Sequence, residues 1–170
     1  MKAVNKFYLA LGPTAFLLGT SVTGMADEDI CVHGHSAESQ TPHSAPVYYG
    51  WGATLAPPSH DGSWLHYSIP TRSGQSLKAI KVKLSTTSNG YIDAIHIWDS
   101  DALKVQLEHL GLKGSETKVV PLSPEQAVSS VGVSIKVKAP PGDDARVQIS
   151  SVCGTFIASP ASDHNSRSPE

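Results

Sequence analysis

Histidines near the start of the sequence have a spacing that suggests a metal site. His33 and His35 are two residues apart, so on a β-strand their side chains would point to the same face. With His43 nearby, they form a candidate copper or zinc site, since imidazole nitrogen binds both metals. The alternative is a polar segment in which these histidines have no joint role.

Two further histidines suggest acid–base chemistry. His66 and His96 lie within strand-like runs, and a hydrolase would need a carboxylate within hydrogen-bond reach of one of them in a cleft. Asp93 is close in sequence to His96, but on a strand the two side chains point to opposite faces. No Gly-x-Ser-x-Gly elbow is present. The sequence therefore indicates no catalytic residue set and no cofactor, and a hydrolase, metal-dependent or not, stays an alternative.

Aromatic side chains give the best argument for a binding site. Tyr48, Trp51, Trp64 and Trp98 make up much of a modest aromatic content. An exposed Trp or Tyr presents a flat apolar face and a polar edge, which suits stacking on a sugar ring. The competing explanation is that these residues fill the core of a chain with only three phenylalanines. One observation distinguishes the two explanations: a binding site requires at least two of these four aromatic side chains to line one open face.

The charged residues argue against nucleic acid as a partner and leave anionic glycans or lipid open. The chain has 13 Lys and Arg against 15 Asp and Glu, a net charge of −2, which gives no electrostatic reason to bind nucleic acid. Five lysines fall on outward strand positions and would form a basic stripe for anionic glycans or lipid if their strands were neighbours: Lys78, Lys81, Lys83, Lys136 and Lys138. The simpler explanation is solubility and protection of strand edges.

Apolar residues recur with a period of two, which predicts half-buried β-strands. The clearest alternations lie in 80–84, 131–137 and 147–149, and three further strands are expected within 47–55, 64–69 and 91–98. Asn89-Gly90 predicts a tight hairpin between the strands on either side. The single helical candidate is the short segment 101–110. We therefore predict an all-β fold, an antiparallel β-sandwich of about seven or eight strands with at most one short helix.

The N-terminal residues have the features of a cleaved signal peptide. Lys2 and Lys6 precede an apolar run, and Gly24-Met25-Ala26 supplies the small residues of a cleavage site. We expect residues 1–26 to be the signal peptide, 27–158 a single domain and 159–170 a disordered Ser- and Pro-rich tail. No later run approaches the length of a membrane span, so we expect a secreted or periplasmic bacterial protein without a transmembrane segment in its mature form.

The two cysteines, Cys31 and Cys153, lie near the two ends of the expected domain. In an oxidising compartment such a pair usually forms a disulfide. The alternatives are two free thiols or a metal site that combines a cysteine with His33 and His35.

Several phrases together resemble a family of small exported bacterial domains of unknown function. They are Cys31-Val32-His33-Gly34, Gly50-Trp51-Gly52, the phrase from Trp64 to Thr71, the phrase from Ile92 to Asp99, and Gly132-Val133-Ser134-Ile135. The resemblance covers about residues 30 to 157 and implies a β-sandwich, but it implies no activity and no site residues. We predict a non-enzymatic binding domain whose partner is a carbohydrate or another cell-envelope component.

Overall fold

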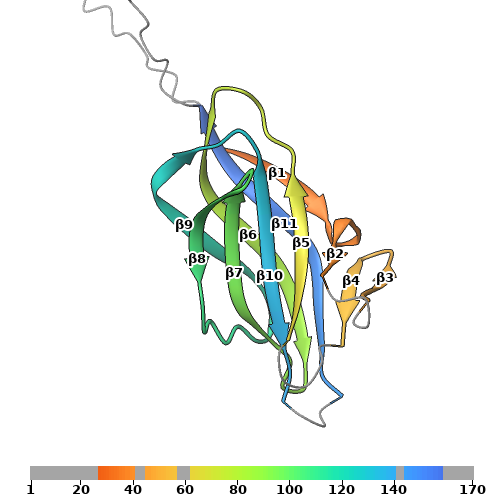
Figure 1. Cartoon of the computed structure of the whole chain (residues 1–170). Coiled ribbons are helices and arrows are strands. Elements are labelled where there is room, and N and C mark those ends of the chain that lie inside the picture. The colour runs from red at the N-terminus through yellow and green to blue at the C-terminus, as the bar shows by residue number, and fades with distance from the viewer. Residues whose placement is uncertain (1–26, 41–44, 57–61, 141–143, 159–170) are drawn as a thin grey trace, which may run out of the picture.

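The computed structural model describes residues 27–40, 45–56, 62–140 and 144–158 (Figure 1). The expected signal peptide, 1–26, and the expected tail, 159–170, lie outside these residues, as does His43. Within the described residues, no helix is long and apolar enough to cross a membrane.

Strands make up nearly all of the described structure, together with one short 3-10 helix. The elements are β1 (Glu28–His33), η1 (Gly34–Ser36), β2 (Glu38–Ser39), β3 (Val47–Tyr49), β4 (Gly52–Leu55), β5 (Ser63–Ile69), β6 (Gln75–Thr87), β7 (Tyr91–Asp99), β8 (Ala102–Leu107), β9 (Ser115–Ala127), β10 (Val131–Lys138) and β11 (Arg146–Ala158).

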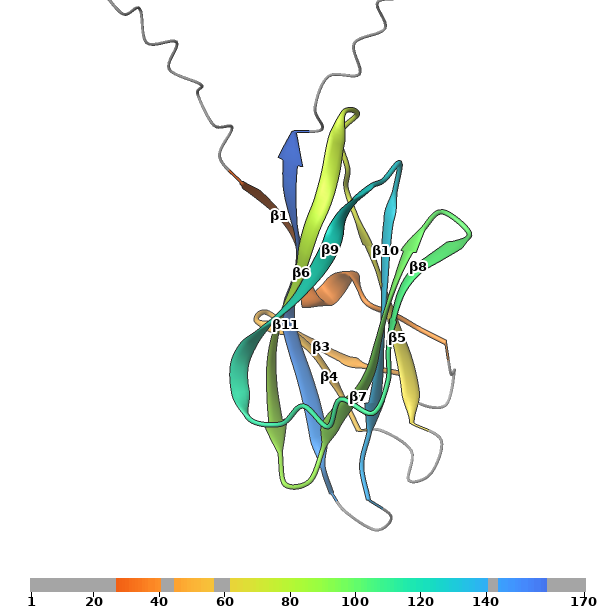
Figure 2. The same cartoon turned by 90° about the vertical axis from the view of Figure 1, so that its left-hand side faces the viewer.

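The strands form two antiparallel sheets that face each other, as Figure 2 shows from the side. One sheet has six strands, in the order β3-β4-β11-β6-β9, with β1 also paired to β11. The other has five strands, in the order β2-β5-β10-β7-β8. The predicted antiparallel β-sandwich is confirmed. It has more strands than expected because β2 and β3 are very short and because the alternation in β9 is weak.

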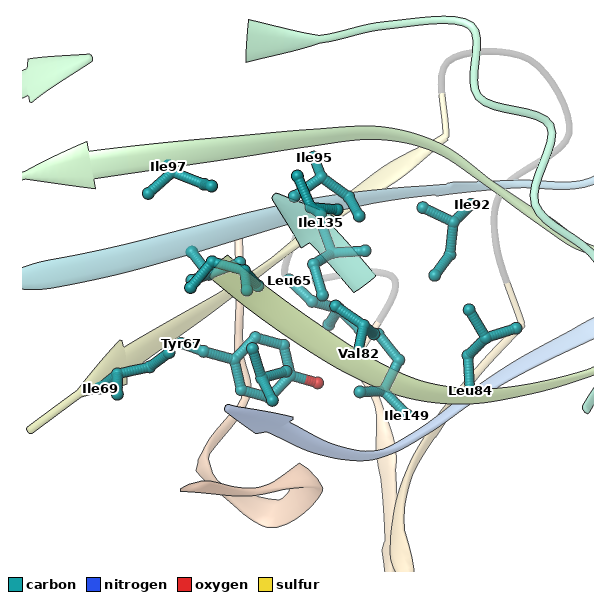
Figure 3. Packing of buried hydrophobic residues seen from close by; sticks show 14 of the residues in the cluster. Leu65, Tyr67, Ile69, Val82, Leu84, Ile92, Ile95, Ile97, Ile135 and Ile149 are labelled. Atoms are coloured by element: carbon teal, nitrogen blue, oxygen red, sulfur yellow. The ribbon is translucent and has the colours of Figure 1, made fainter. Parts of the chain in front are cut away.

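The core lies between the two sheets and consists of the inward side chains predicted by the period-two pattern. Val82 and Leu84 come from β6, and Ile149 comes from β11, all fully or almost fully buried. They meet Leu65 and Ile135 of the opposite sheet (Figure 3). Burying aliphatic side chains from both sheets is the main force that holds the layers together.

Two predictions of local structure are wrong. Segment 101–110 contains strand β8 instead of a helix, because Leu103, Val105 and Leu107 alternate with polar residues and pair with β7. Asn89-Gly90 does not close a hairpin, because β6 and β7 belong to different sheets. The turn there carries the chain from one layer to the other.

The predicted disulfide between Cys31 and Cys153 is present and joins β1 to β11. The two residues are directly opposite each other in the antiparallel pair, and 122 positions separate them in sequence. Three exposed or half-exposed ion pairs also connect residues 27–29 to β6 and the turn before it: Lys78 with Asp27, Lys81 with Asp29, and Arg72 with Glu28. The disulfide therefore links the two ends of the described chain.

Tyr67 places a polar atom inside the apolar core (Figure 3). It is 2% exposed, and its hydroxyl has no hydrogen-bond partner among the described residues. Burial raises the pKa of Tyr67 well above its usual value. A buried hydroxyl without a partner has lost its bonds to water and gained none, which costs stability.

We expect Tyr67→Phe to raise the free energy of unfolding by about 1 kcal/mol, since it removes only the unpaired hydroxyl. Tyr48→Phe is the matched control, because the Tyr48 hydroxyl donates to the carbonyl oxygen of Ala37 at 2.7 Å; it should lower stability. Urea unfolding of the three proteins measures both effects. A loss of stability in Tyr67→Phe would show that its hydroxyl has a favourable interaction.

Candidate functional site

A row of polar side chains crosses the outer face of the five-stranded sheet. Each strand contributes one residue, in the order Glu38, His66, Ser134, His96 and Gln106, and each is directly opposite the next in the strand register. Neighbouring strands lie about 4.8 Å apart, so the row is about 19 Å long. The inward neighbours of these residues in β5, β10 and β7 are core residues, which fixes the row on the outer face.

Trp64 and Trp98 lie diagonally on either side of this polar row. Trp64 is opposite Lys136 of β10, and Trp98 is opposite Gly132. Both tryptophans are partly exposed. Because Gly132 has no side chain, no side chain of β10 covers the sheet surface beside Trp98 at that position. The two tryptophans therefore lie on the same face of the sheet. Two of the four aromatic residues on one face is the arrangement expected of a binding surface and not of residues that fill the core.

A shallow pocket of about 220 Å³ lies between the two tryptophans. Its lining residues are Gln40, Trp64, His66, His96, Trp98 and Ser134. The ring centroid of His96 lies 4.6 Å from that of Trp64 and 6.4 Å from that of Trp98. The ammonium group of Lys136 lies 5.6 Å from the centroid of the Trp64 ring, a cation–π contact. These contacts hold the rings in place before any ligand binds.

Hydrogen bonds also order the polar row. His66 Nδ1 lies 2.8 Å from Ser134 Oγ. His96 Nε2 lies 2.5 Å from Glu108 Oε1, which also accepts a bond from the side-chain amide of Gln106 at 3.1 Å. The bond from His96, and then that from Gln106, lower the pKa of Glu108. The row and the neighbouring Glu108 therefore hold hydroxyl, imidazole, amide and carboxylate groups in two hydrogen-bonded sets, His66 with Ser134 and His96 with Glu108 and Gln106.

Burial lowers the pKa of His66, with a smaller opposing effect from Glu38. We expect wild-type protein to lose more stability than His66→Gln when the pH falls from 7 to 5. The unfolded chain takes up this proton near pH 6.5, whereas the folded domain does so only at a lower pH, so stability falls as the pH drops below 6.5. Urea unfolding of both proteins at both pH values measures the difference. Equal losses would mean that His66 protonates alike in both states.

The contact between His96 and Glu108 meets the condition that the sequence analysis set for a hydrolase, a histidine in a cleft with a carboxylate in reach. Ser134 beside His66 adds a hydroxyl. However, Ser134 lies in the middle of β10, which pairs with β5 on one side and β7 on the other. Its backbone amides are directed within the sheet plane, so they cannot stabilise an oxyanion above Ser134. The arrangement suits hydrogen bonding to a ligand better than acyl transfer.

The other two predicted aromatic residues lie elsewhere. Trp51 is 46% exposed in the turn between β3 and β4, which belong to the six-stranded sheet. Tyr48 is also exposed, but its hydroxyl bonds to Ala37 and its ring contacts that of His35. The four predicted residues therefore do not form one site.

The predicted metal ligands His33 and His35 lie at the end of β1 and in η1, with ring centroids 4.5 Å apart. His33 Nδ1 accepts a bond from the backbone amide of His35, and His35 Nε2 contacts the carbonyl oxygen of Tyr49. In the part of the chain that the structure describes, no three or more His, Cys, Asp or Glu side chains gather to hold a metal ion.

The five lysines do not form a basic stripe, because their strands are not neighbours. Lys78, Lys81 and Lys83 belong to β6 of the six-stranded sheet, whereas Lys136 and Lys138 belong to β10 of the other sheet. Lys138 forms an ion pair with buried Asp93, with Nζ 2.8 Å from Oδ2.

Sequence reasoning missed Ser134, Gln40 and Glu108 as members of the site. Ser134 has a visible signal, since it alternates with the buried Val133 and Ile135 and must face outward. Gln40 and Glu108 follow the edge strands β2 and β8, whose pairing with β5 and β7 decides what they contact.

No family model matches the chain. A search of curated proteins also finds no match. Among solved structures, a family 29 carbohydrate-binding module has a TM-score of 0.51 at 11% sequence identity, over 76% of this chain and 89% of that chain. A point mutant of such a module, made to probe ligand recognition, gives the same score and identity over 76% and 92%. These likenesses show that the chain has the same β-sandwich fold.

A third structure, the low-affinity xylan-binding module CBM86 from Roseburia intestinalis, has a TM-score of 0.49 and 14% identity, over 76% of this chain and 96% of that chain.

Proposed function

We propose that this protein is a carbohydrate-binding domain and that the outer face of the five-stranded sheet binds a neutral glycan chain. One observation carries the proposal: Trp64 and Trp98 lie on either side of a polar row to which all five strands contribute. The fold that the chain shares with carbohydrate-binding modules supports it.

The geometry suits a sugar chain for two reasons. A pyranose ring has an apolar face that stacks on an indole ring, and two tryptophans on one face offer two stacking positions. Its hydroxyl groups both donate and accept hydrogen bonds, and the row offers imidazole, hydroxyl and amide groups that do the same. The row crosses the whole outer face of the sheet, with Ser134 buried and His66 and His96 half-buried between the two tryptophans. The shallow pocket between the tryptophans is open to solvent, so a polymer can lie across it without a chain end entering a pocket.

The contacts within the row reduce the cost of binding. His66 is held by Ser134, and His96 is held between Trp64 and Glu108. Side chains that are already ordered lose little conformational entropy when a ligand binds. We further propose that the protein acts outside the cytoplasm, as the expected signal peptide and the Cys31–Cys153 disulfide suggest.

A screen of the purified protein against immobilised neutral and acidic glycans tests the proposal. We expect binding to at least one neutral polysaccharide, with competition by its soluble oligosaccharide but not by the free monosaccharide at the same concentration. Reduced and unfolded protein serves as the control for non-specific adsorption. Failure to bind any neutral glycan would overturn the proposed function.

A further inference from the structure

A second pocket lies on the outer face of the six-stranded sheet, on the side of the sandwich opposite to the polar row. It has a volume of about 340 Å³, and its lining residues are Tyr49, Trp51, Thr54, Ser85, Thr87, Arg146 and Gln148. They come from four neighbouring strands and the turn between β3 and β4. Neither its position nor its residues overlap with the site already described.

An aromatic pair forms one wall of this pocket. The rings of Tyr49 and Trp51 stack with their centroids 4.6 Å apart and their planes 8° from parallel. Tyr49 is 42% exposed and Trp51 is 46% exposed. A stacked pair of this kind is rigid and leaves ring surface for a ligand, as a sugar-stacking wall requires.

Polar side chains form the floor. Thr54, Gln148 and Ser85 are directly opposite one another across β4, β11 and β6. Thr54 is 7% exposed, and its hydroxyl has no hydrogen-bond partner among the described residues. A buried hydroxyl without a partner is uncommon in a folded protein. Gln148 and Ser85 are half-buried and are the floor residues whose polar groups a ligand can reach.

Arg146 gives this pocket its charge. It lies opposite Thr87 on β6 and is exposed. Its guanidinium is 3.7 Å from the carboxylate of Asp144, whose side chain is 93% exposed. Such an exposed pair is weak, so a ligand carboxylate can compete for the guanidinium. Arginine binds carboxylates through two parallel hydrogen bonds, a geometry that a neutral hydroxyl does not match.

We infer that this pocket is a second, independent glycan site that takes an acidic sugar, a hexuronate residue. The sugar ring stacks on the Tyr49–Trp51 wall, its hydroxyls meet the floor, and its carboxylate pairs with Arg146. The site differs from the polar row in both its face and its ligand charge, so it does not depend on the proposed neutral-glycan function.

Calorimetric titration of the purified protein with oligomers of galacturonate, glucuronate and mannuronate tests the inference, with the methyl ester of each oligomer as the uncharged probe. We expect at least one acidic oligomer to bind more tightly than its ester by tenfold or more. Arg146→Gln should remove this preference, and Trp51→Ala should weaken both probes. Arg72→Gln is the matched control, because Arg72 pairs with Glu28 away from the pocket and should leave binding unchanged.

Several results would overturn the inference: equal binding of acid and ester, no binding of any acidic oligomer, or loss of acidic binding in Trp64→Ala while Trp51→Ala still binds. That last result would assign the acidic ligand to the polar row. Conversely, if Trp51→Ala and Arg146→Gln lose acidic binding and no neutral glycan binds the wild type, the second site stands and the proposed neutral-glycan function fails.

Discussion

Replacing Cys31 and Cys153 together by alanine is expected to lower the free energy of unfolding by about 4–5 kcal/mol. The disulfide closes a loop with a sequence separation of 122 residues. In the chain-entropy model, a cross-link across a loop of that length lowers the conformational entropy of the unfolded chain, and the folded state is stabilised by this amount. The ion pairs that residues 27–29 form with Arg72, Lys78 and Lys81 do not compensate, because each lies at the surface and stabilises by less than about 1 kcal/mol.

Urea unfolding of the wild type and the double variant, each with and without reductant, measures the effect. Reductant should lower the stability of the wild type to that of the variant and leave the variant unchanged. We also expect β1 to separate first, which exposes the edge of β11 and favours aggregation. A difference below about 1 kcal/mol would show that the unfolded chain is already held compact without the disulfide.

Replacing Trp64 and Trp98 together by alanine is expected to weaken binding of a neutral glycan about 100-fold. Each ring contributes about 1–2 kcal/mol through the apolar area it covers and the stacking contact. Single variants should therefore lose about tenfold each. Both side chains lie on the outer face of the sheet, so the folded core should be retained, as thermal unfolding can verify.

Trp51→Ala is the matched control for this experiment. It removes the same side chain from the opposite face of the sandwich and should leave neutral-glycan affinity unchanged. Calorimetric titration with the oligosaccharide selected by the screen gives the affinities of the wild type and all four variants. If Trp51→Ala weakens binding of that ligand as much as the double variant does, the polar row is not the neutral-glycan site.

The β-sandwich was predictable because apolar and polar residues alternate over 80–84 of β6, 131–137 of β10 and 147–149 of β11. Local signals failed where a partner strand decides the structure. Asn89-Gly90 has the residues of a hairpin turn, but β6 pairs with β9 and β11, and β7 pairs with β8 and β10. Likewise, segment 102–107 forms strand β8 because it pairs with β7 at the edge of the five-stranded sheet.

The candidate site was predictable only in part, for the same reason. Trp64 and Trp98 are outward residues of β5 and β7, whereas the sequence left open whether they face outward or fill the core. Their position on either side of the polar row depends on the register in which β5 and β7 pair with β10. That register cannot be predicted from the spacing of residues within either strand. Trp51 illustrates this point. It is exposed, as a binding residue must be, but it lies beside β3 and β4 of the six-stranded sheet, away from Trp64 and Trp98.

The two ends of the described chain lie next to each other, because Glu28 pairs with Phe156. The start of β1 and the end of β11 therefore lie at the same end of the sandwich (Figure 2), so tethers attached to the two strands would pull on that one end. Tension between two such tethers would pass through the covalent link at Cys31 and Cys153 and would not reach the residues between them. Under oxidising conditions, a sandwich pulled in this way would keep both of its broad faces intact while it carries mechanical load.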